Sequence, residues 1–373
     1  MSKQTIRLSI VAGARPNFIK IAPIIRALEQ HADVFDYRLV HTGQHYDRNM
    51  SEVFFEELGI PPPDHHLNVG SGSHAVQTAE IMTRFETVCL ADRPHAVLVV
   101  GDVNSTLACS IVAKKLGIAV VHVEAGLRSG DTRMPEEINR MVTDAITDLF
   151  FVTEPSGVEN LLREGHLPSS IHFVGHVMID NLFHQLAALA RMETTGFEGD
   201  SLKRSLPAYG IVTLHRPSNV DDPQALSGVV AGLSAVAADL PLIFPAHPRT
   251  RARLDEFGLT LPPGIHLLEP LPYMAFLHLW KDARLVLTDS GGLQEETTAL
   301  GIPCLTLREN TERPVTVDEG SNELVGTDPV RIQEATLKIL SAPVGKTRAR
   351  PSLWDGRAAE RIVAVLANQR WFA

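Results

Sequence analysis

Short apolar runs alternate with amphipathic segments along the whole chain. In the first half, runs rich in Val, Ile and Leu occupy residues 6–12, 37–41, 96–100, 118–123 and 149–152. The stretches between them have helical spacing, at residues 19–29, 49–58, 77–90, 105–115, 136–146 and 155–164. Continuously apolar strands that alternate with helices predict an α/β fold whose parallel sheet is covered on both faces.

The second half repeats this alternation after an interruption. Its predicted strands are residues 210–214, 242–246, 265–268, 285–288 and 304–306, and its predicted helices are residues 223–237, 250–257, 273–281, 293–300 and 329–341. Between the halves, a helix over residues 180–190 runs into a stretch without periodicity. The pattern predicts two Rossmann-like domains facing each other across a cleft: residues 1–180, a linker at 181–207, and residues 208–356. A final helix, 357–368, has no strand after it and is expected to pack back on the first domain.

Composition excludes several classes of protein but does not identify the function. The chain has 373 residues, a length typical of two domains, with 44% hydrophobic and 21% charged residues. We expect no membrane span, because no apolar run approaches the roughly 18–20 residues needed, and a cytoplasmic location, because no signal-type segment precedes the first strand. A net charge of −10 argues against nucleic-acid binding. Cys89, Cys109 and Cys304 are far apart, which predicts buried reduced thiols and no metal site.

Two basic residues follow the first predicted strand. Arg15 and Lys20 lie on either side of a strand-to-helix turn that begins at Gly13. This position in a Rossmann fold commonly meets phosphate, and a guanidinium with an ammonium suits a pyrophosphate. The turn lacks the G-x-G-x-x-G pattern of dinucleotide sites, so no NAD or other cofactor is expected. Two solvated basic residues beside a turn are the alternative.

Three acids are predicted to meet at one edge of the first sheet. Asp102 and Glu124 each follow a buried strand, and Glu136 begins a helix that carries Arg140 one turn later. Taken singly, Asp102 is also compatible with a helix cap and Glu136 with a plain helix start. Together, converging carboxylates shift one another's pKa values, so that one can hold a proton while another accepts one.

The second half carries a predicted anion site. Two strands end in a histidine with a basic partner, at His215-Arg216 and at His247-Pro-Arg249, and isolated histidines at such positions are more often structural. A further strand is followed by Ser290, Gly291 and Gly292, which open a helix whose free N–H groups and dipole favour phosphate. Glu296 lies one turn into that helix, within reach of a ribose diol, and Arg313 adds a cation from the next loop.

Taken in order, these segments resemble the non-hydrolysing UDP-N-acetylglucosamine 2-epimerase family. The resemblance extends from Gly13 to about Gly326. It rests on the motifs G-A-R-P-N-F-I-K at 13–20, H-T-G-Q-H at 41–45, G-D at 101–102, H-V-E-A-G-L-R at 122–128, P-E-E-I-N-R at 135–140, L-H-R at 214–216, T-D-S-G-G-L-Q-E-E at 288–296 and T-E-R-P at 311–314.

The resemblance implies a fold, a substrate and a set of roles. The fold is of the GT-B glycosyltransferase type, and the family works in the cytoplasm as a homodimer that serves polysaccharide assembly. The UDP moiety is held by Arg15, Lys20, His215, Ser290, Gly291, Gly292, Glu296 and Arg313. Phe276 and the backbone near Leu271 lie against the uracil, and Arg140 belongs to the substrate-binding set. His215 also counts among the catalytic residues, with Asp102, Glu124 and Glu136.

The implied reaction is reversible inversion at C2 of the sugar. The C2 proton is removed and UDP leaves, which gives a 2-acetamidoglucal, and UDP then re-adds after reprotonation on the other face. The product is UDP-N-acetylmannosamine. In the working hypothesis Asp102 and Glu136 exchange protons with the sugar while Glu124 positions or polarises it. The assignment of base and acid stays open.

Four alternatives remain at this point. Some motifs also resemble relatives that epimerise UDP-2,3-diacetamido-glucuronic acid, whose additional carboxylate calls for another cation, such as Arg128 or Arg133. A GT-B glycosyltransferase would need an acceptor groove, and the grouped acids favour proton chemistry instead. Hydrolytic release of N-acetylmannosamine is disfavoured because no kinase domain follows. A silent binding protein is the least favoured, because every candidate position retains its chemistry.

Overall fold

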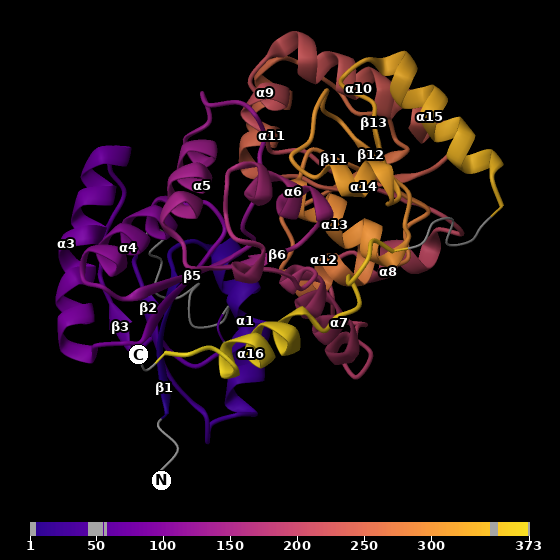
Figure 1. The fold of residues 1–373 in the computed structure, drawn as a ribbon. Coiled ribbons are helices and arrows are strands. Elements are labelled where there is room, and N and C mark those ends of the chain that lie inside the picture. The colour runs from indigo at the N-terminus through magenta and orange to yellow at the C-terminus, as the bar shows by residue number, and fades with distance from the viewer. Residues whose placement is uncertain (1–4, 44–54, 56–57, 344–349, 372–373) are drawn as a thin grey trace. The chain divides into compact units, whose positions relative to one another are not determined.

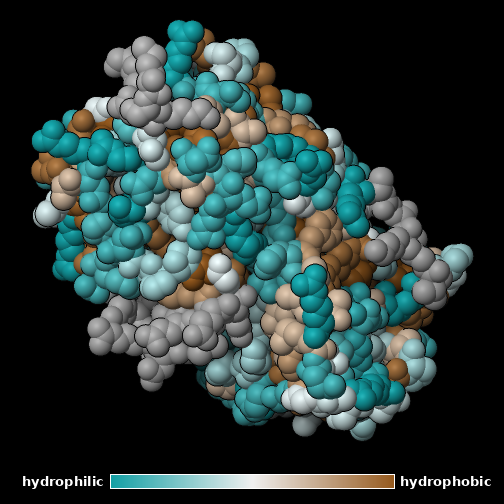
Figure 2. Space-filling model, turned by 90° about the horizontal axis from the view of Figure 1, so that it is seen from below, coloured by the Kyte–Doolittle hydropathy of each residue, from teal (hydrophilic) through white to brown (hydrophobic). Residues whose placement is uncertain are grey.

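The computed structural model describes residues 5–43, 55, 58–343 and 350–371, and it divides into two compact units. Unit 1 comprises Met1–Asn181 and Ser352–Ala373, and unit 2 comprises Leu182–Pro351. Each unit contains one parallel sheet (Figure 1). No helix in the described part of the chain is long and apolar enough to cross a bilayer. The face drawn in Figure 2 is covered mostly by hydrophilic residues, with smaller apolar areas between them.

The sheet of unit 1 has the strand order β3-β2-β1-β4-β5-β6-β7. Its strands are β1 (Ile6–Ala12), β2 (Phe35–His41), β3 (His65–His66), β4 (Ala96–Val100), β5 (Ala119–Val123), β6 (Leu149–Val152) and β7 (Ile171–Phe173). The central strand β1 pairs in parallel with β2 on one side and with β4 on the other. The order reverses between β1 and β4, and this switch point is where open α/β sheets bind ligands, outside the carboxyl ends of the strands.

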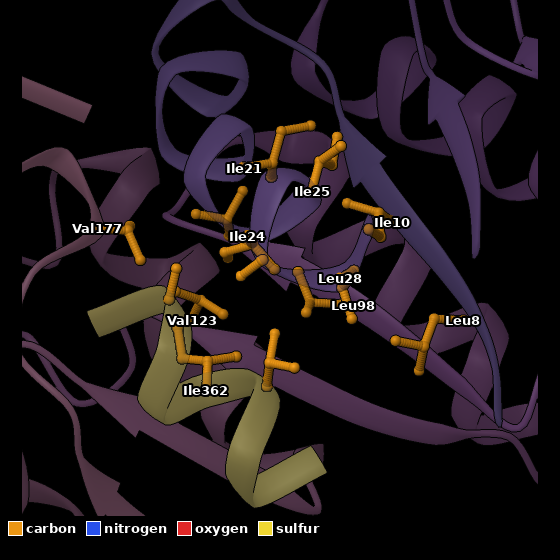
Figure 3. Close-up of a cluster of buried hydrophobic side chains, with 14 of the residues drawn as sticks. Leu8, Ile10, Ile21, Ile24, Ile25, Leu28, Leu98, Val123, Val177 and Ile362 are labelled. Carbon is orange, nitrogen blue, oxygen red and sulfur yellow. The ribbon is translucent and has the colours of Figure 1, made fainter. Parts of the chain in front are cut away.

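Helices cover both faces of this sheet because successive strand residues point to opposite sides. Unit 1 contains α1 (Arg15–Glu29), α3 (His74–Asp92), α4 (Asn104–Lys115), α5 (Pro135–Ile146), α6 (Pro155–Arg163), η1 (Pro168–Ser170), the start of α7 (Val177–Leu189), and α16 (Ala358–Ala367). Ile10 and Leu98 face the cluster that includes α1 and α16, whereas Val97 and Val99 face α3 and α4. Figure 3 shows Ile24 of α1 and Ile362 of α16 within the first of these clusters.

The C-terminal helix α16 is fixed to unit 1 at its first turn. The carboxylate of Asp180, at the start of α7, accepts hydrogen bonds from the backbone N–H groups of Ala358 and Ala359 at 3.1 and 2.7 Å. Burial outweighs these bonds and raises the pKa of Asp180 to about 6. Figure 1 shows α16, in yellow, beside α1, in indigo. Each large apolar side chain buried at this contact contributes roughly 1.5–3 kcal/mol.

Unit 2 repeats the topology with the order β10-β9-β8-β11-β12-β13. The strands are β8 (Gly210–Thr213), β9 (Leu242–Pro245), β10 (Ile265–Leu268), β11 (Leu285–Thr288), β12 (Cys304–Thr306) and β13 (Asn322–Leu324). The helices are α8 (Asp200–Ser205), α9 (Pro217–Val220), α10 (Pro223–Ala237), α11 (Pro248–Glu256), α12 (Tyr273–Trp280), α13 (Gly291–Leu300), α14 (Pro314–Asp318) and α15 (Pro329–Ser341). Here the strand order reverses between β8 and β11.

The structure differs from the sequence expectation mainly in short elements and at the unit boundaries. The edge strands β3, β7 and β13 were not predicted, because they are short and carry His, or Asn and Glu, in place of an apolar run. Residues 181–207 do not form a separate linker: α8 lies within them, and its buried Asp200 accepts a hydrogen bond from His278 on α12 at 2.8 Å. The return to unit 1 falls at residue 352 rather than after 356, and the predicted helix at 49–58 lies almost wholly outside the described residues.

Candidate functional site

In unit 1 a buried ion pair lies at the switch point. Lys20, in the second turn of α1, places its Nζ 2.6 Å from Oε2 of Glu124, and both side chains are buried. A Cβ on Gly101 would lie only 3.1 Å from this Nζ, so glycine leaves the ammonium its space. The sequence grouped Lys20 with Arg15 for a pyrophosphate, whereas the structure puts Lys20 on an acid. The side chain of Arg15 lies outside the described residues.

Glu124 itself has an unusual backbone. It follows β5 with φ of +71°, in the left-handed region that non-glycine residues seldom occupy. Such a conformation costs about 1–3 kcal/mol and persists where surrounding contacts hold it. Its N–H donates to the carbonyl of Phe151 on β6 at 3.0 Å. The turn therefore fixes the direction in which the Glu124 carboxylate leaves the sheet.

The second acid, Asp102, is held by an arginine on α5. Nη1 of Arg140 lies 2.5 Å from Oδ2 of Asp102, which is partly exposed, whereas Arg140 is buried. Behind Arg140 lies Glu137, whose Oε2 is 2.7 Å from Nη2 of the arginine. Glu137 also accepts the backbone N–H groups of Ser129 and Gly130. Burial acts to raise the pKa of Glu137, but these bonds and the charge of Arg140 outweigh it, so the pKa is lowered.

The third predicted acid is not part of this cluster in the described residues. Glu136 is exposed on the first turn of α5, and the described part of the chain offers it no hydrogen bond or ion pair. Its neighbour Glu137 is the buried one. Glu137 was not among the residues predicted from the sequence, although its spacing of three residues from Arg140 is that of an ion pair on one helix face.

In unit 2 the corresponding edge is organised by a buried acid, Asp289. It is fully buried after β11 and accepts the backbone N–H groups of His215 and Arg216, which follow β8, at 3.1 and 3.0 Å. The imidazole Nδ1 of His215 lies 3.0 Å from Oδ1 of Asp289, while the rest of this side chain is half exposed. The two strand ends at the switch point are thus joined through one carboxylate, and the ring of His215 is oriented by it.

Small residues open the helix beside this carboxylate. Ser290 precedes α13, whose first two residues are Gly291 and Gly292, and no described side chain caps this end. The N–H of Ser290 donates to Oγ1 of Thr288 at 2.9 Å. A Cβ on Gly291 would stand 3.2 Å from Oε1 of Glu312. A side chain at position 291 would therefore crowd Glu312 at the positive end of the α13 dipole, where an anion is favoured.

Arginines surround this helix end, each held by an acid. Arg216 and Arg308 both reach Glu312, at 3.0 and 2.9 Å. Burial acts to raise the pKa of Glu312, but the hydrogen bond from Arg308 and the charges of Arg308, Arg313 and Arg216 lower it to about 2. Arg313 itself forms an ion pair with the buried Glu295 on α13. Among the described residues, neither His247 nor Arg249 contacts these groups. Arg249 forms an ion pair with Asp221 instead.

The remaining predicted residues lie along α12 and α13. Glu296, buried on α13, accepts a hydrogen bond from the hydroxyl of Tyr273 at 2.9 Å. Burial and the charge of Glu296 raise the pKa of this tyrosine well above its ordinary value. Phe276 is partly buried on α12, and Leu271 is partly buried just before that helix. The sequence did not predict Tyr273.

Comparison with known proteins places the chain in a family. The sequence model of the family described as UDP-N-acetylglucosamine 2-epimerase matches residues 26–367. The chain belongs to this family. A UDP-N-acetylglucosamine 2-epimerase of Methanocaldococcus jannaschii is 43% identical over 98% of this chain and 100% of its own length. A UDP-2,3-diacetamido-2,3-dideoxy-D-glucuronate 2-epimerase of Pseudomonas aeruginosa is 39% identical over 97% of this chain and 100% of its own length.

Solved structures give the same result for the fold. The crystal structure of the M. jannaschii UDP-GlcNAc 2-epimerase in complex with UDP-GlcNAc and UDP matches with a TM-score of 0.85. The identity is 42%, over 98% of this chain and 100% of that one. The GT-B type fold predicted from the sequence, with two Rossmann-like units, is confirmed.

Proposed function

We propose that this epimerase inverts C2 of UDP-N-acetylglucosamine and yields UDP-N-acetylmannosamine, in both directions, without a metal or cofactor. The observation that carries the proposal is the pair of carboxylates at the switch point of unit 1, Asp102 against Arg140 and Glu124 against Lys20. The relative from M. jannaschii bears the name of this activity, and its crystal structure contains UDP-GlcNAc and UDP.

The reaction needs a base, a stabilised leaving group and a shielded site. A carboxylate removes the C2 proton, the C2–H electron pair forms the C1=C2 bond of a 2-acetamidoglucal, and the C1–O bond breaks with its electrons on UDP. Reprotonation at C2 from the other face and attack of the UDP oxygen on C1 complete the inversion. The balance is closed, because one proton leaves, one returns, and no electron is gained or lost.

The contacts in unit 1 support distinct roles for its acids. Glu124 is held by the buried ammonium of Lys20, which suits a group that positions or polarises the sugar. Asp102 is partly exposed and can reach a ligand, and Glu136 is exposed on α5 beside Arg140. We assign the proton transfers to Asp102 and Glu136, with Arg140 as a substrate-binding residue.

The contacts in unit 2 support binding of the UDP group. Ser290, Gly291 and Gly292 present the start of α13 to the phosphates, with Arg313 and the half-exposed His215 as neighbouring donors. His215 also stabilises the leaving group in the proposal. Glu296 binds the ribose hydroxyls, while Phe276 and the backbone at Leu271 contact the uracil.

A homodimer is part of the proposal. On α5 the apolar side chains Ile138, Met141 and Val142 are exposed at helical spacing. We assign this strip to contact with a second copy of the chain. Met141→Glu is then expected to convert a dimer to a monomer in sedimentation analysis, and Leu167→Glu, at another exposed apolar position, is the matched control. A monomeric wild-type chain would contradict this assignment.

The decisive experiment is a proton NMR time course with UDP-N-acetylglucosamine in D₂O. The proposal expects the manno epimer with deuterium at C2 and UDP still attached. Release of free N-acetylmannosamine would assign the chain to hydrolysing relatives instead. Absence of any change at C2 would contradict the proposal for this substrate.

The second candidate is the same reaction on UDP-2,3-diacetamido-glucuronic acid. This candidate is supported by the relative from P. aeruginosa, which bears the name of this activity and is 39% identical. In unit 1, Arg128 is held between Asp144 and Glu164, whereas Arg133 is largely exposed and paired with Asp131. Arg133 is therefore the better candidate for a sugar carboxylate. The same D₂O experiment with this substrate, on wild type and Arg133→Gln, separates the two candidates.

A further inference from the structure

A fully buried histidine lies next to the turns that carry the two acids of unit 1. His122 belongs to β5, two residues before Glu124, and its side chain has no exposed surface. The ring bridges two segments: Nε2 is 2.9 Å from the carbonyl oxygen of Gly101, and Nδ1 is 2.7 Å from Oδ1 of Asp144 on α5. His122 was not among the residues to which the sequence gave a role.

The contacts determine which ring nitrogens carry protons. A carbonyl oxygen only accepts hydrogen bonds, so Nε2 of His122 must donate to Gly101. Asp144 accepts the backbone N–H of Gly126 at 3.0 Å and forms an ion pair with Arg128 at 2.8 Å. The guanidinium of Arg128 and the N–H of Gly126 can only donate, and the positive charge of Arg128 favours the carboxylate form of Asp144. Asp144 is thus an ionised acceptor, and Nδ1 must donate as well.

These bonds attach to the turns that carry the acids. Gly101, with φ of +68°, immediately precedes Asp102. Gly126, with φ of +81°, follows Glu124 by two residues, and a Cβ there would stand 2.4 Å from the carbonyl oxygen of Gly157. Asp144 lies one turn beyond Arg140 on α5. One pair of side chains therefore connects both acid-bearing turns with the helix that supplies the arginine.

We propose that His122 is a buried imidazolium that, with Asp144, positions Asp102 and Glu124 for proton transfer at C2. This inference rests on the proposed function and deepens it, because His122 touches no substrate and acts only through the turns. Proton transfer between a sugar carbon and a carboxylate requires placement to a fraction of an ångström, and a displacement of about 1 Å can cost a hundredfold in rate. Two charged donors in a dry interior hold such placement better than neutral ones.

The charge of His122 is tested on the intact, unliganded chain by nitrogen-15 NMR of its histidine side chains. The resonance of His122 is assigned by its loss in His122→Gln. Near neutral pH both ring nitrogens are expected at the chemical shifts of protonated nitrogens, each coupled to a hydrogen. A single protonated nitrogen would overturn the proposal. This measurement does not depend on the substrate, so it decides the charge even where the proposed reaction fails.

The positioning role is tested by kinetics of two variants. His122→Gln keeps a hydrogen-bond donor but loses the positive charge. Asp144→Asn keeps the shape of the side chain but loses the negative charge, and it is the variant to measure if His122→Gln does not fold. Each is expected to lower kcat and C2 deuterium exchange about 10- to 100-fold, with KM changed by less than about threefold. UDP affinity, a property of unit 2 in the proposal, is expected to stay at the wild-type value. His172→Gln, on β7 of the same sheet, is the matched control and keeps full activity.

Two results would overturn the positioning role. Unchanged kcat in a folded His122→Gln or Asp144→Asn variant is the first. Parallel loss of kcat and UDP affinity is the second, since it indicates general loss of structure. If the wild-type chain exchanges no C2 proton of any UDP-sugar, the proposed function itself fails, and the NMR result then stands alone as a statement about the buried charge.

Discussion

The switch points of the two sheets share a topology and differ in the sign of the groups they present. In unit 1 the carboxylates of Asp102 and Glu124 are backed by the buried cations of Arg140 and Lys20. In unit 2 the arrangement is reversed, since His215 is backed by the buried carboxylate of Asp289. Both sheets have the strand order typical of Rossmann-like folds, with the reversal at the first strand.

The fold supplies only the location of a site. Parallel strands bring their carboxyl ends to one edge in both units, but the residues that follow the strands decide which groups that edge presents. The partly exposed Asp102 is held by the buried Arg140, and the half-exposed His215 by the buried Asp289, which fixes the geometry of each and compensates the buried charge. Four variants test this difference between the units.

The largest effect is expected from removing the charge of Asp102. Asp102→Asn keeps the shape but cannot take up a proton, so kcat for epimerisation is expected to fall about a thousandfold. UDP affinity, measured by calorimetry, is expected to stay unchanged because unit 2 is untouched. Asp33→Asn, on an exposed turn of unit 1, is the control. An equal loss of UDP binding would show that the division of roles between the units is wrong.

The next effect concerns the stability of unit 2 in acid. Glu312 has a pKa of about 2 in the folded chain against an ordinary value of 4.5. A lowered carboxyl pKa contributes stability that is fully present above pH 4.5 and is lost as the pH falls towards 2, here roughly 3 kcal/mol. Urea unfolding of wild type and Glu312→Gln is expected to show a difference at pH 6 that shrinks at pH 3. A difference independent of pH would contradict the ion-pair account.

A smaller effect is expected from the acid behind Arg140. Glu137→Gln removes the charge that holds Arg140 against Asp102, and kcat is expected to fall about tenfold while KM changes little. Steady-state kinetics measures both. Glu80→Gln, an exposed residue on α3, is the control and should behave as wild type. If KM rises and kcat does not fall, the prediction is wrong, and Arg140 binds substrate without orienting Asp102.

An effect of the same size as that of Glu137→Gln is expected at the helix start in unit 2. Gly291→Val places a side chain within contact of Glu312 and over the N–H groups of α13, so UDP affinity is expected to fall about tenfold, or 1.4 kcal/mol. Calorimetry with UDP measures this. Gly196→Val, where no atom lies within 4 Å of an added Cβ, is the control. Undiminished affinity would place the phosphates elsewhere.

The main helices and strands were predictable because their signal is local. The strand at residues 96–100 and the helix at 329–341 match β4 and α15 exactly in extent, since apolar periodicity is written into the chain itself. The edge strand β3 could not be predicted, because two consecutive histidines become a strand only by pairing with β2. The same holds for α8, whose place depends on the bond between Asp200 and His278, 78 positions away.

The sequence alone predicted the two α/β units, the family and a set of candidate site positions, since strand ends and glycine-rich helix starts are local features. The partners of those positions were visible only in the folded chain. It paired Lys20 with Glu124, put Glu137 rather than Glu136 in the buried cluster, and placed His122 between Gly101 and Asp144. The physical reason is that pairing of buried charges depends on distances between residues far apart in the chain, and periodicity carries no record of those distances.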